Sequence, residues 1–432
     1  MRRPLAPFHS VAFLALASLP FLALAQAPAE PAKPAEAPKP PLFSIYGTLD
    51  ANVQYTTASG ATTAAQDVAG RAAVSFDSSN IGIRGVLQVN EYAGATYQCE
   101  TAASADGIAG AVLCNRNSRV GLTGNWGTLW YGNWDTPFKA AIYGTKADDP
   151  FNKTDVYGFQ GIMGSPGFNY RSGSYSLAAD TVTKGFDLRA QNSVGYHSPK
   201  FYGVSLKLQY TVNEFMNATA TQDPSLYGAV LNWDYGPFSI LAAYEQHNDG
   251  WGLAGINAGT AAAPLAFGAT VANNVTTAGH SSDSAWRVGA GYQLDWMAGA
   301  TTLSALYDQL TFKQDKALAG MVKQYKRAAW HVALKHRIAE HEIRARYSMA
   351  NDGDVTLVSG GGSTTDYGAS MLALGYAYYF APSFNVYLHY AQITNKDNAQ
   401  YTLTIGGSPA VAGATPRGAD PMAVGLGFRY TF

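Results

Sequence analysis

The sequence predicts an all-β fold, a transmembrane antiparallel β-barrel of about sixteen strands. Three observations support this prediction. The chain begins with a segment typical of an export signal, the rest lacks the run of about 18 apolar residues that a membrane-spanning helix needs, and short segments with one apolar face recur along it. Only helices and closed barrels satisfy every backbone polar group inside a bilayer, so such an exported chain is expected in the outer membrane.

The N-terminal residues 1–25 are typical of a secretory signal peptide. Arg2 and Arg3 supply positive charge, an apolar core follows from Val11 to Leu24, and Ala23-Leu24-Ala25 provides a small-x-small cleavage pattern. The alternative is an uncleaved membrane anchor. The apolar core is short for a bilayer about 30 Å thick, which favours the signal peptide.

Residues 26–41 are rich in Ala, Pro, Glu and Lys. This composition cannot bury a core, and it predicts an extended, solvated spacer in the periplasm. The barrel is then expected to occupy residues 42–432.

Charge and motifs exclude several function classes. The chain has 29 Lys+Arg against 30 Asp+Glu, and nucleic acid is not expected as a partner because phosphate binding needs a concentrated basic excess. Neither Gly-x-Ser-x-Gly nor His-Glu-x-x-His occurs, and the histidines are scattered, so we expect no enzyme. No metal or cofactor is expected either.

The strand pattern is clearest at the C-terminus and near the middle of the chain. In residues 422–432 and 286–296, apolar or aromatic residues alternate with small or polar ones. A barrel strand in a membrane shows this period of two, with the apolar side facing lipid and the polar side facing the lumen. Aromatic residues at both ends of the apolar side fit the two membrane interfaces.

The connections between the predicted strands alternate between short and long. Tight turns such as Asn125-Trp126-Gly127 and Ala381-Pro382-Ser383 alternate with long stretches such as 250–282 and 352–366. Outer-membrane barrels have short periplasmic turns and long external loops. The pattern indicates about sixteen strands, a size that leaves an aqueous channel.

One connection, between Asp135 and Asn192, is longer than fifty residues. It carries Asp148, Asp149 and Asp155, and it is the third external loop of the predicted barrel. A loop of this length is usually functional. From the pattern alone, it either folds into the lumen or covers the outer surface.

Many basic residues lie on the side of their strand opposite the apolar one. They are Arg84, Arg119, Arg327, Lys335, Arg337, Arg344, Arg346 and Arg429. One interpretation is that they only avoid lipid, where a cation costs about 2–4 kcal/mol at mid-bilayer. The other is that they form a basic wall that faces the acidic third loop, creates a transverse field and gives the channel a weak preference for anions.

Cys99 and Cys114 are the two cysteines of the chain. An exported protein meets oxidising conditions, so we expect them to form a disulfide. A metal site is the alternative, but no other ligand lies at suitable spacing beside them.

Five motifs stand out along the chain: the opening segment 44–51, residues 116–129, Gly132-Asn133-Trp134-Asp135-Thr136-Pro137, residues 192–199 and the C-terminal segment 428–432. Together they resemble motifs of the trimeric general porins of Gram-negative bacteria, especially of beta-proteobacteria. The resemblance covers the chain from about Phe43. Related porins often carry Arg where this chain has Asn133 and Gly195, so their ion preference cannot be transferred.

The resemblance implies a homotrimer with one pore per subunit and with the third loop folded into the lumen. It also implies an outer-membrane channel for passive diffusion of ions and small hydrophilic solutes, in contact with lipid and lipopolysaccharide. Two other functions stay open. One is a substrate-specific channel for a sugar, phosphate or organic acid, and the other is an adhesin or structural barrel.

Overall fold

The computed structural model describes residues 42–432 apart from several short ranges. The ranges left out are 77, 104–111, 153, 155, 168–173, 176–184, 213–223, 250–255, 261–262, 268–279, 316–321, 358–364 and 404–414. The predicted signal peptide (1–25) and spacer (26–41) lie outside the described residues. Within the described part, no helix has the length and apolar character needed to cross a membrane.

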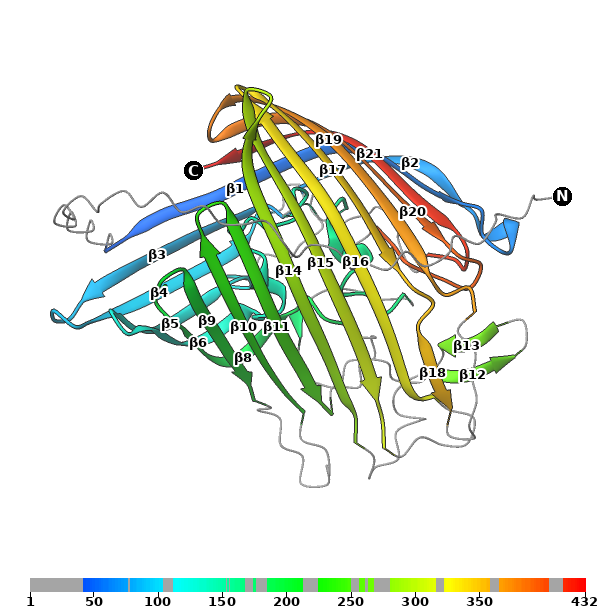
Figure 1. Cartoon of the computed structure of the whole chain (residues 1–432), viewed down its shortest axis with the longest axis horizontal. Coiled ribbons are helices and arrows are strands. Elements are labelled where there is room, and N and C mark those ends of the chain that lie inside the picture. Colours follow the sequence, from blue (N-terminus) through cyan, green and yellow to red (C-terminus); the bar gives the residue numbers. More distant parts are fainter. Residues whose placement is uncertain are drawn as a thin grey trace, which may run out of the picture. The chain divides into compact units, whose positions relative to one another are not determined.

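The described chain forms one antiparallel sheet that closes on itself. The first strand, β1 (Ser44–Ser59), lies beside the last, β21 (Asp420–Thr431), and pairs with it (Figure 1). In this pairing Asp50 is opposite Arg429. The other strands of the sheet are β2 (Val68–Ser75), β3 (Asn80–Gln88), β4 (Ala93–Ala102), β5 (Ser118–Gly124), β6 (Gly127–Asp135), β8 (Arg189–His197), β9 (Val204–Thr211), β10 (Ser225–Tyr235), β11 (Phe238–Asn248), β14 (Ser282–Trp296), β15 (Gly299–Lys313), β16 (Val322–Ile338), β17 (His341–Ala350), β18 (Asp354–Leu357), β19 (Ala369–Ala381) and β20 (Phe384–Asn395).

Two barrel strands are interrupted. Both β2 and β3 pair with β1, and both β17 and β18 pair with β16, so each couple occupies one position in the barrel. The described barrel therefore has 16 strands, which confirms the predicted fold class. The two-residue strand β7 (Ser174–Tyr175) pairs in parallel with the start of β8. Outside the sheet lie the hairpin of β12 (Ile256–Thr260) and β13 (Ala263–Phe267) and the short 3-10 helices η1 (Ala64–Gln66), η2 (Lys139–Ala141) and η3 (Phe159–Gly161).

The outer face is apolar, as the period of two predicts. On β21, Val424, Leu426 and Phe428 are exposed while the alternating Ala423 and Gly425 are buried. The same alternation continues on the neighbouring strands, because each is paired in register with the next. Exposed apolar side chains on a closed sheet are explained by contact with lipid.

The inner face differs from the expectation of a polar lumen. On β11 and β15 the inward positions include Leu241, Ala243, Leu306 and Leu310, all buried. They pack against apolar side chains of the connection between β6 and β8, residues 136–188, which we call the β6–β8 segment. The inner wall is apolar at these positions because the segment covers it.

The orientation of β14 can be tested with Val288, which is exposed on the outer face near the middle of the strand. The substitution Val288→Lys is expected to lower the free energy of unfolding by about 2–4 kcal/mol, because it places a cation at mid-bilayer. Denaturant titration in lipid vesicles measures the change. Thr302→Lys, at a half-buried inward position of β15, is the control and should cost less, whereas equal losses would contradict the assigned faces.

Cys99 of β4 and Cys114 form a disulfide, with their Cα atoms 4.7 Å apart and 15 positions apart in the sequence. A crosslink that closes a loop of this length removes about 3 kcal/mol of chain entropy from the unfolded state. Replacing both cysteines by Ser is therefore expected to lower the free energy of unfolding by about that amount. The same titration measures it, with reduced wild type as the control. A double variant as stable as the oxidised protein would contradict this prediction.

Candidate functional site

The β6–β8 segment packs against the inner face of the barrel. Its side chains Phe138, Phe151, Tyr157 and Phe159 are fully buried and belong to one apolar cluster with inward residues of the strands. Two of these rings lie against His389 of β20, with centroid distances of 5.3 Å for Phe151 and 5.2 Å for Tyr157. The described part of the segment is thus attached to the wall by apolar contacts over several strands.

Glycines in the strands make room for this close packing. A Cβ atom built on Gly291 of β14 would lie 2.0 Å from the carbonyl carbon of Lys146 and 2.3 Å from the backbone nitrogen of Ala147. On β21, a Cβ on Gly425 would lie 2.2 Å from the hydroxyl oxygen of Tyr157. Real Cβ atoms do not approach so closely, so only glycine at position 291 lets the backbone of the segment lie there, and Gly425 makes room for the Tyr157 side chain.

Arg287 of β14 binds both ends of the segment, near Phe138 and near Asp187. Its guanidinium donates hydrogen bonds of 2.8 and 3.0 Å to Asp187 of the segment and of 2.8 and 2.7 Å to Asp308 of β15. It also donates to the backbone carbonyl of Phe138, at 3.0 Å. All three ionic side chains have zero exposure. A buried arginine shared by two carboxylates fixes the geometry of both partners.

Two more buried arginines contact the segment from neighbouring strands. Arg346 of β17 forms a 2.6 Å ion pair with Asp149, and both side chains have zero exposure. Arg327 of β16 donates to the carbonyl oxygens of Met163 and Ser165. Burial raises the pKa of Asp149, and the adjacent guanidinium of Arg346 opposes that effect.

These contacts correct one part of the predicted basic wall. Arg327 and Arg346 face inward, as their position in the strand predicted, but they are buried beneath the segment and do not line open lumen. The period of two gives the face of the strand on which a residue lies. It does not reveal which loop covers that face, so the prediction could not separate buried from open positions.

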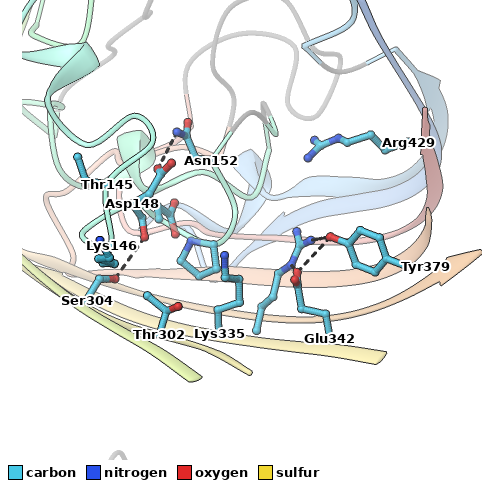
Figure 2. A pocket seen from close by; sticks show the side chains of 13 residues that line it. Thr145, Lys146, Asp148, Asn152, Thr302, Ser304, Lys335, Glu342, Tyr379 and Arg429 are labelled. Carbon is cyan, nitrogen blue, oxygen red and sulfur yellow. Dashed lines mark hydrogen bonds and ion pairs between the residues drawn. The ribbon is translucent and has the colours of Figure 1, made fainter. Parts of the chain in front are cut away.

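A cavity of about 200 Å³ lies between the segment and the wall formed by β15, β16, β17, β19 and β21 (Figure 2). Cations of the strands and acidic or amide side chains of the segment meet there. The lining residues are Thr145, Lys146, Asp148, Asp149, Pro150, Asn152, Thr302, Ser304, Lys335, Glu342, Arg344, Tyr379 and Arg429. The structure thus brings Asp148 and Asp149 together with Lys335, Arg344 and Arg429 of the predicted wall.

The cations of this cavity differ in their partners. Arg344 donates to Glu342 at 2.6 Å, and Arg429 forms a 2.5 Å ion pair with Asp50. Lys335 forms no ion pair with any described residue, and in Figure 2 its side chain reaches from the strand toward the segment. The field of Arg344 and Arg429 is largely neutralised by their own carboxylates. Lys335, and Lys146 of the segment, which also forms no ion pair with a described residue, therefore contribute more net charge to the cavity.

The remaining arginines of the predicted wall do not line this cavity. Arg84 stacks on Tyr46, with its Cζ atom 4.5 Å from the ring centroid, and Arg337 stacks on Tyr379 at 3.8 Å. Arg119 lies on β5, which is not one of the strands that form the wall of the cavity. The third predicted acidic residue, Asp155, lies outside the described residues.

Sequence reasoning did not identify Arg287, Asp187 and Asp308 as important. A signal for Arg287 was present, because it alternates with the outward Trp286 and Val288 and therefore faces inward. Nothing comparable pointed to Asp187, since the position of a loop residue does not follow from strand periodicity.

The two positions where related porins often carry arginine have a local explanation. A Cβ on Gly195 of β8 would lie 2.2 Å from the indole ring of Trp130 on β6, so the tryptophan occupies the space next to this position. The side-chain amide of Asn133 donates to the backbone carbonyls of Asn115 and Arg116. Both positions thus serve local packing and hydrogen bonding.

Comparison with known proteins identifies a family and a relative with similar sequences. The sequence profile described as Gram-negative porin matches residues 10–324. Outer membrane porin protein 32 of Delftia acidovorans is 23% identical over 391 residues, which cover 90% of this chain and 93% of that protein.

Two solved structures are similar in fold. An anion-selective porin from Comamonas acidovorans superposes with a TM-score of 0.65 at 21% identity, covering 90% of this chain and 99% of that one. OmpT of Vibrio cholerae in its trimer form superposes with a TM-score of 0.56 at 15% identity, covering 91% and 100%. Because the family profile spans more than half of the chain, the protein belongs to the Gram-negative porin family and is a channel protein of the outer membrane.

Proposed function

We propose that this porin is a general diffusion channel whose narrowest part is formed by the β6–β8 segment folded into the lumen. Ions and small hydrophilic solutes would cross passively through water beside the cavity lined by Lys335 and Asp148. The observation that carries this proposal is the meeting of segment and wall at that cavity, where opposite charges lie across a small gap. Such an arrangement orders water and dipolar solutes and disfavours apolar ones.

A weak preference for anions is part of the proposal. Lys335 forms no ion pair among the described residues, whereas Asp149 is neutralised by Arg346. The similar Comamonas porin is described as anion-selective, which agrees with this sign.

The assembly is proposed to be a homotrimer in contact with outer-membrane lipid and lipopolysaccharide. OmpT of Vibrio cholerae has been resolved in a trimer form, and the apolar outer face described above suits lipid or a second subunit. We further propose that residues 1–25 are removed on export, that residues 26–41 form a periplasmic spacer, and that the barrel performs no catalysis.

Swelling of liposomes that contain the purified protein tests general diffusion against a substrate-specific channel. With neutral sugars of increasing size, the account predicts swelling rates that fall smoothly with solute size. For phosphates or organic acids of equal size, the swelling rate should depend only on the charge of the solute. One solute entering far faster than smaller members of its series would instead indicate a substrate-specific channel.

A further inference from the structure

A second site lies on the inner wall formed by β5, β6, β8 and β9, away from the cavity described above. The guanidinium of Arg119 stacks on the indole of Trp134, with its Cζ atom 4.2 Å from the ring centroid. The Nη1 atom of Arg119 lies 3.2 Å from Nδ1 of His197. Trp130 completes the group, with its ring centroid 5.7 Å from those of Trp134 and of His197.

The hydrogen-bond roles in this group follow from chemistry. Arginine can only donate, so Nδ1 of His197 accepts, and a neutral imidazole then carries its proton on Nε2. The indole N–H of Trp130 and the Nε–H of Arg119 are buried donors with no partner among the described residues. This group of side chains therefore has several hydrogen-bond donors and lacks free hydrogen-bond acceptors.

A second cation borders the same histidine. Lys207 of β9 is directly opposite His197 in the antiparallel pairing, and inward positions of a cross-strand pair bring their Cβ atoms to about 5 Å. Neither Lys207 nor Arg119 forms an ion pair within the described chain, and Asp234, an acidic residue of the neighbouring strand, is paired with Lys200. Two cations and several free donors beside aromatic rings are complementary to an anion that carries a ring or apolar body.

We propose that this wall binds small organic anions in which a carboxylate is attached to a planar or apolar body. The carboxylate would accept hydrogen bonds from Arg119 and lie near Lys207, and the body would contact the exposed part of Trp134. Both side chains and the ring are half-buried and inward-facing. The inference rests on the proposed function only in that the solute reaches the wall through the lumen.

The test uses benzoate, with benzyl alcohol as the uncharged ring and acetate as the carboxylate without a ring. Benzoate is expected to reduce the single-channel current of wild-type protein at lower concentrations than either control solute. In Arg119→Gln the half-blocking concentration should rise about tenfold, because a charge-assisted hydrogen bond is lost. Lys207→Gln should also raise the half-blocking concentration, although this substitution leaves the tryptophans unchanged.

Arg337→Gln is the matched control, since Arg337 also stacks on an aromatic ring but lies at neither site. Benzoate should block this variant at the same concentration as it blocks the wild-type protein. The proposal is overturned if benzoate blocks no better than acetate, or if both Arg119→Gln and Lys207→Gln block as wild type does.

Calorimetric titration of benzoate into the detergent-solubilised wild-type protein separates this inference from the channel itself. Binding without any conductance would support the site and reject the proposed function. Conductance without benzoate binding would support the proposed function and overturn the site.

Discussion

Arg287→Ala is expected to lower the free energy of unfolding by about 3–5 kcal/mol, the largest stability change of any single substitution considered for this barrel. The substitution leaves Asp187 and Asp308 buried without their shared guanidinium. Desolvated carboxylates without a cation are strongly unfavourable, so the Asp187 end of the β6–β8 segment should also detach from the wall. Denaturant titration and limited proteolysis within the segment measure the two consequences.

Two variants make this experiment decisive. Arg84→Ala removes an exposed arginine without an ion pair among the described residues, and it should change stability little. The triple variant Arg287→Met with Asp187→Asn and Asp308→Asn removes all three charges and should recover most of the loss, because the penalty comes from the unpaired carboxylates. An Arg287→Ala protein as stable as wild type would show that the segment is not held by this contact.

Lys335→Glu is expected to produce the largest change in ion preference. The substitution reverses the charge of the one strand cation in the cavity that forms no ion pair with a described residue. A unit charge 4 Å from an ion in water contributes about 1 kcal/mol. Lys335→Glu changes the charge by two units, about 2 kcal/mol, so the permeability ratio of chloride to potassium should fall by roughly thirtyfold for an ion at that distance. The reversal potential of single channels in a salt gradient measures this ratio.

Lys323→Glu is the matched control, because Lys323 lies on the same strand but is exposed at its opposite end. Its reversal potential should stay close to that of wild type at moderate salt, where exposed distant charges are screened. Neutralising Arg344 should shift the ratio less than Lys335→Glu, because Arg344 is already paired with Glu342. Equal shifts of the reversal potential for Lys335→Glu and Lys323→Glu would show that the cavity does not border the conduction path.

The sequence was sufficient to predict the barrel because its signal is local. Alternation such as Val424, Leu426 and Phe428 against Ala423 and Gly425 is imposed by lipid on one face, and it repeats strand by strand. The inward position of Lys335 followed from the same alternation. These features depend on neighbours two positions apart and need no knowledge of distant contacts.

The covering of the inner wall could not be predicted in this way. Arg346 and Asp149 are 197 positions apart, and only the path of the segment brings them together. The inward Leu241 and Ala243 appear out of place in a polar lumen until the segment is seen to bury them. Glycines such as Gly291 carried a hint, since small inward residues allow close packing, but they do not indicate what packs there.

Thiol labelling at position 335 during single-channel recording tests the central claim most directly. Both native cysteines form the disulfide, so a cysteine introduced by Lys335→Cys is the only free thiol. The account predicts that a negatively charged thiol reagent lowers the chloride current in steps, while Val332→Cys on the lipid-facing side of the same strand gives no change. Complete labelling at position 335, verified by mass, with an unchanged current would contradict a conduction path beside the β6–β8 segment.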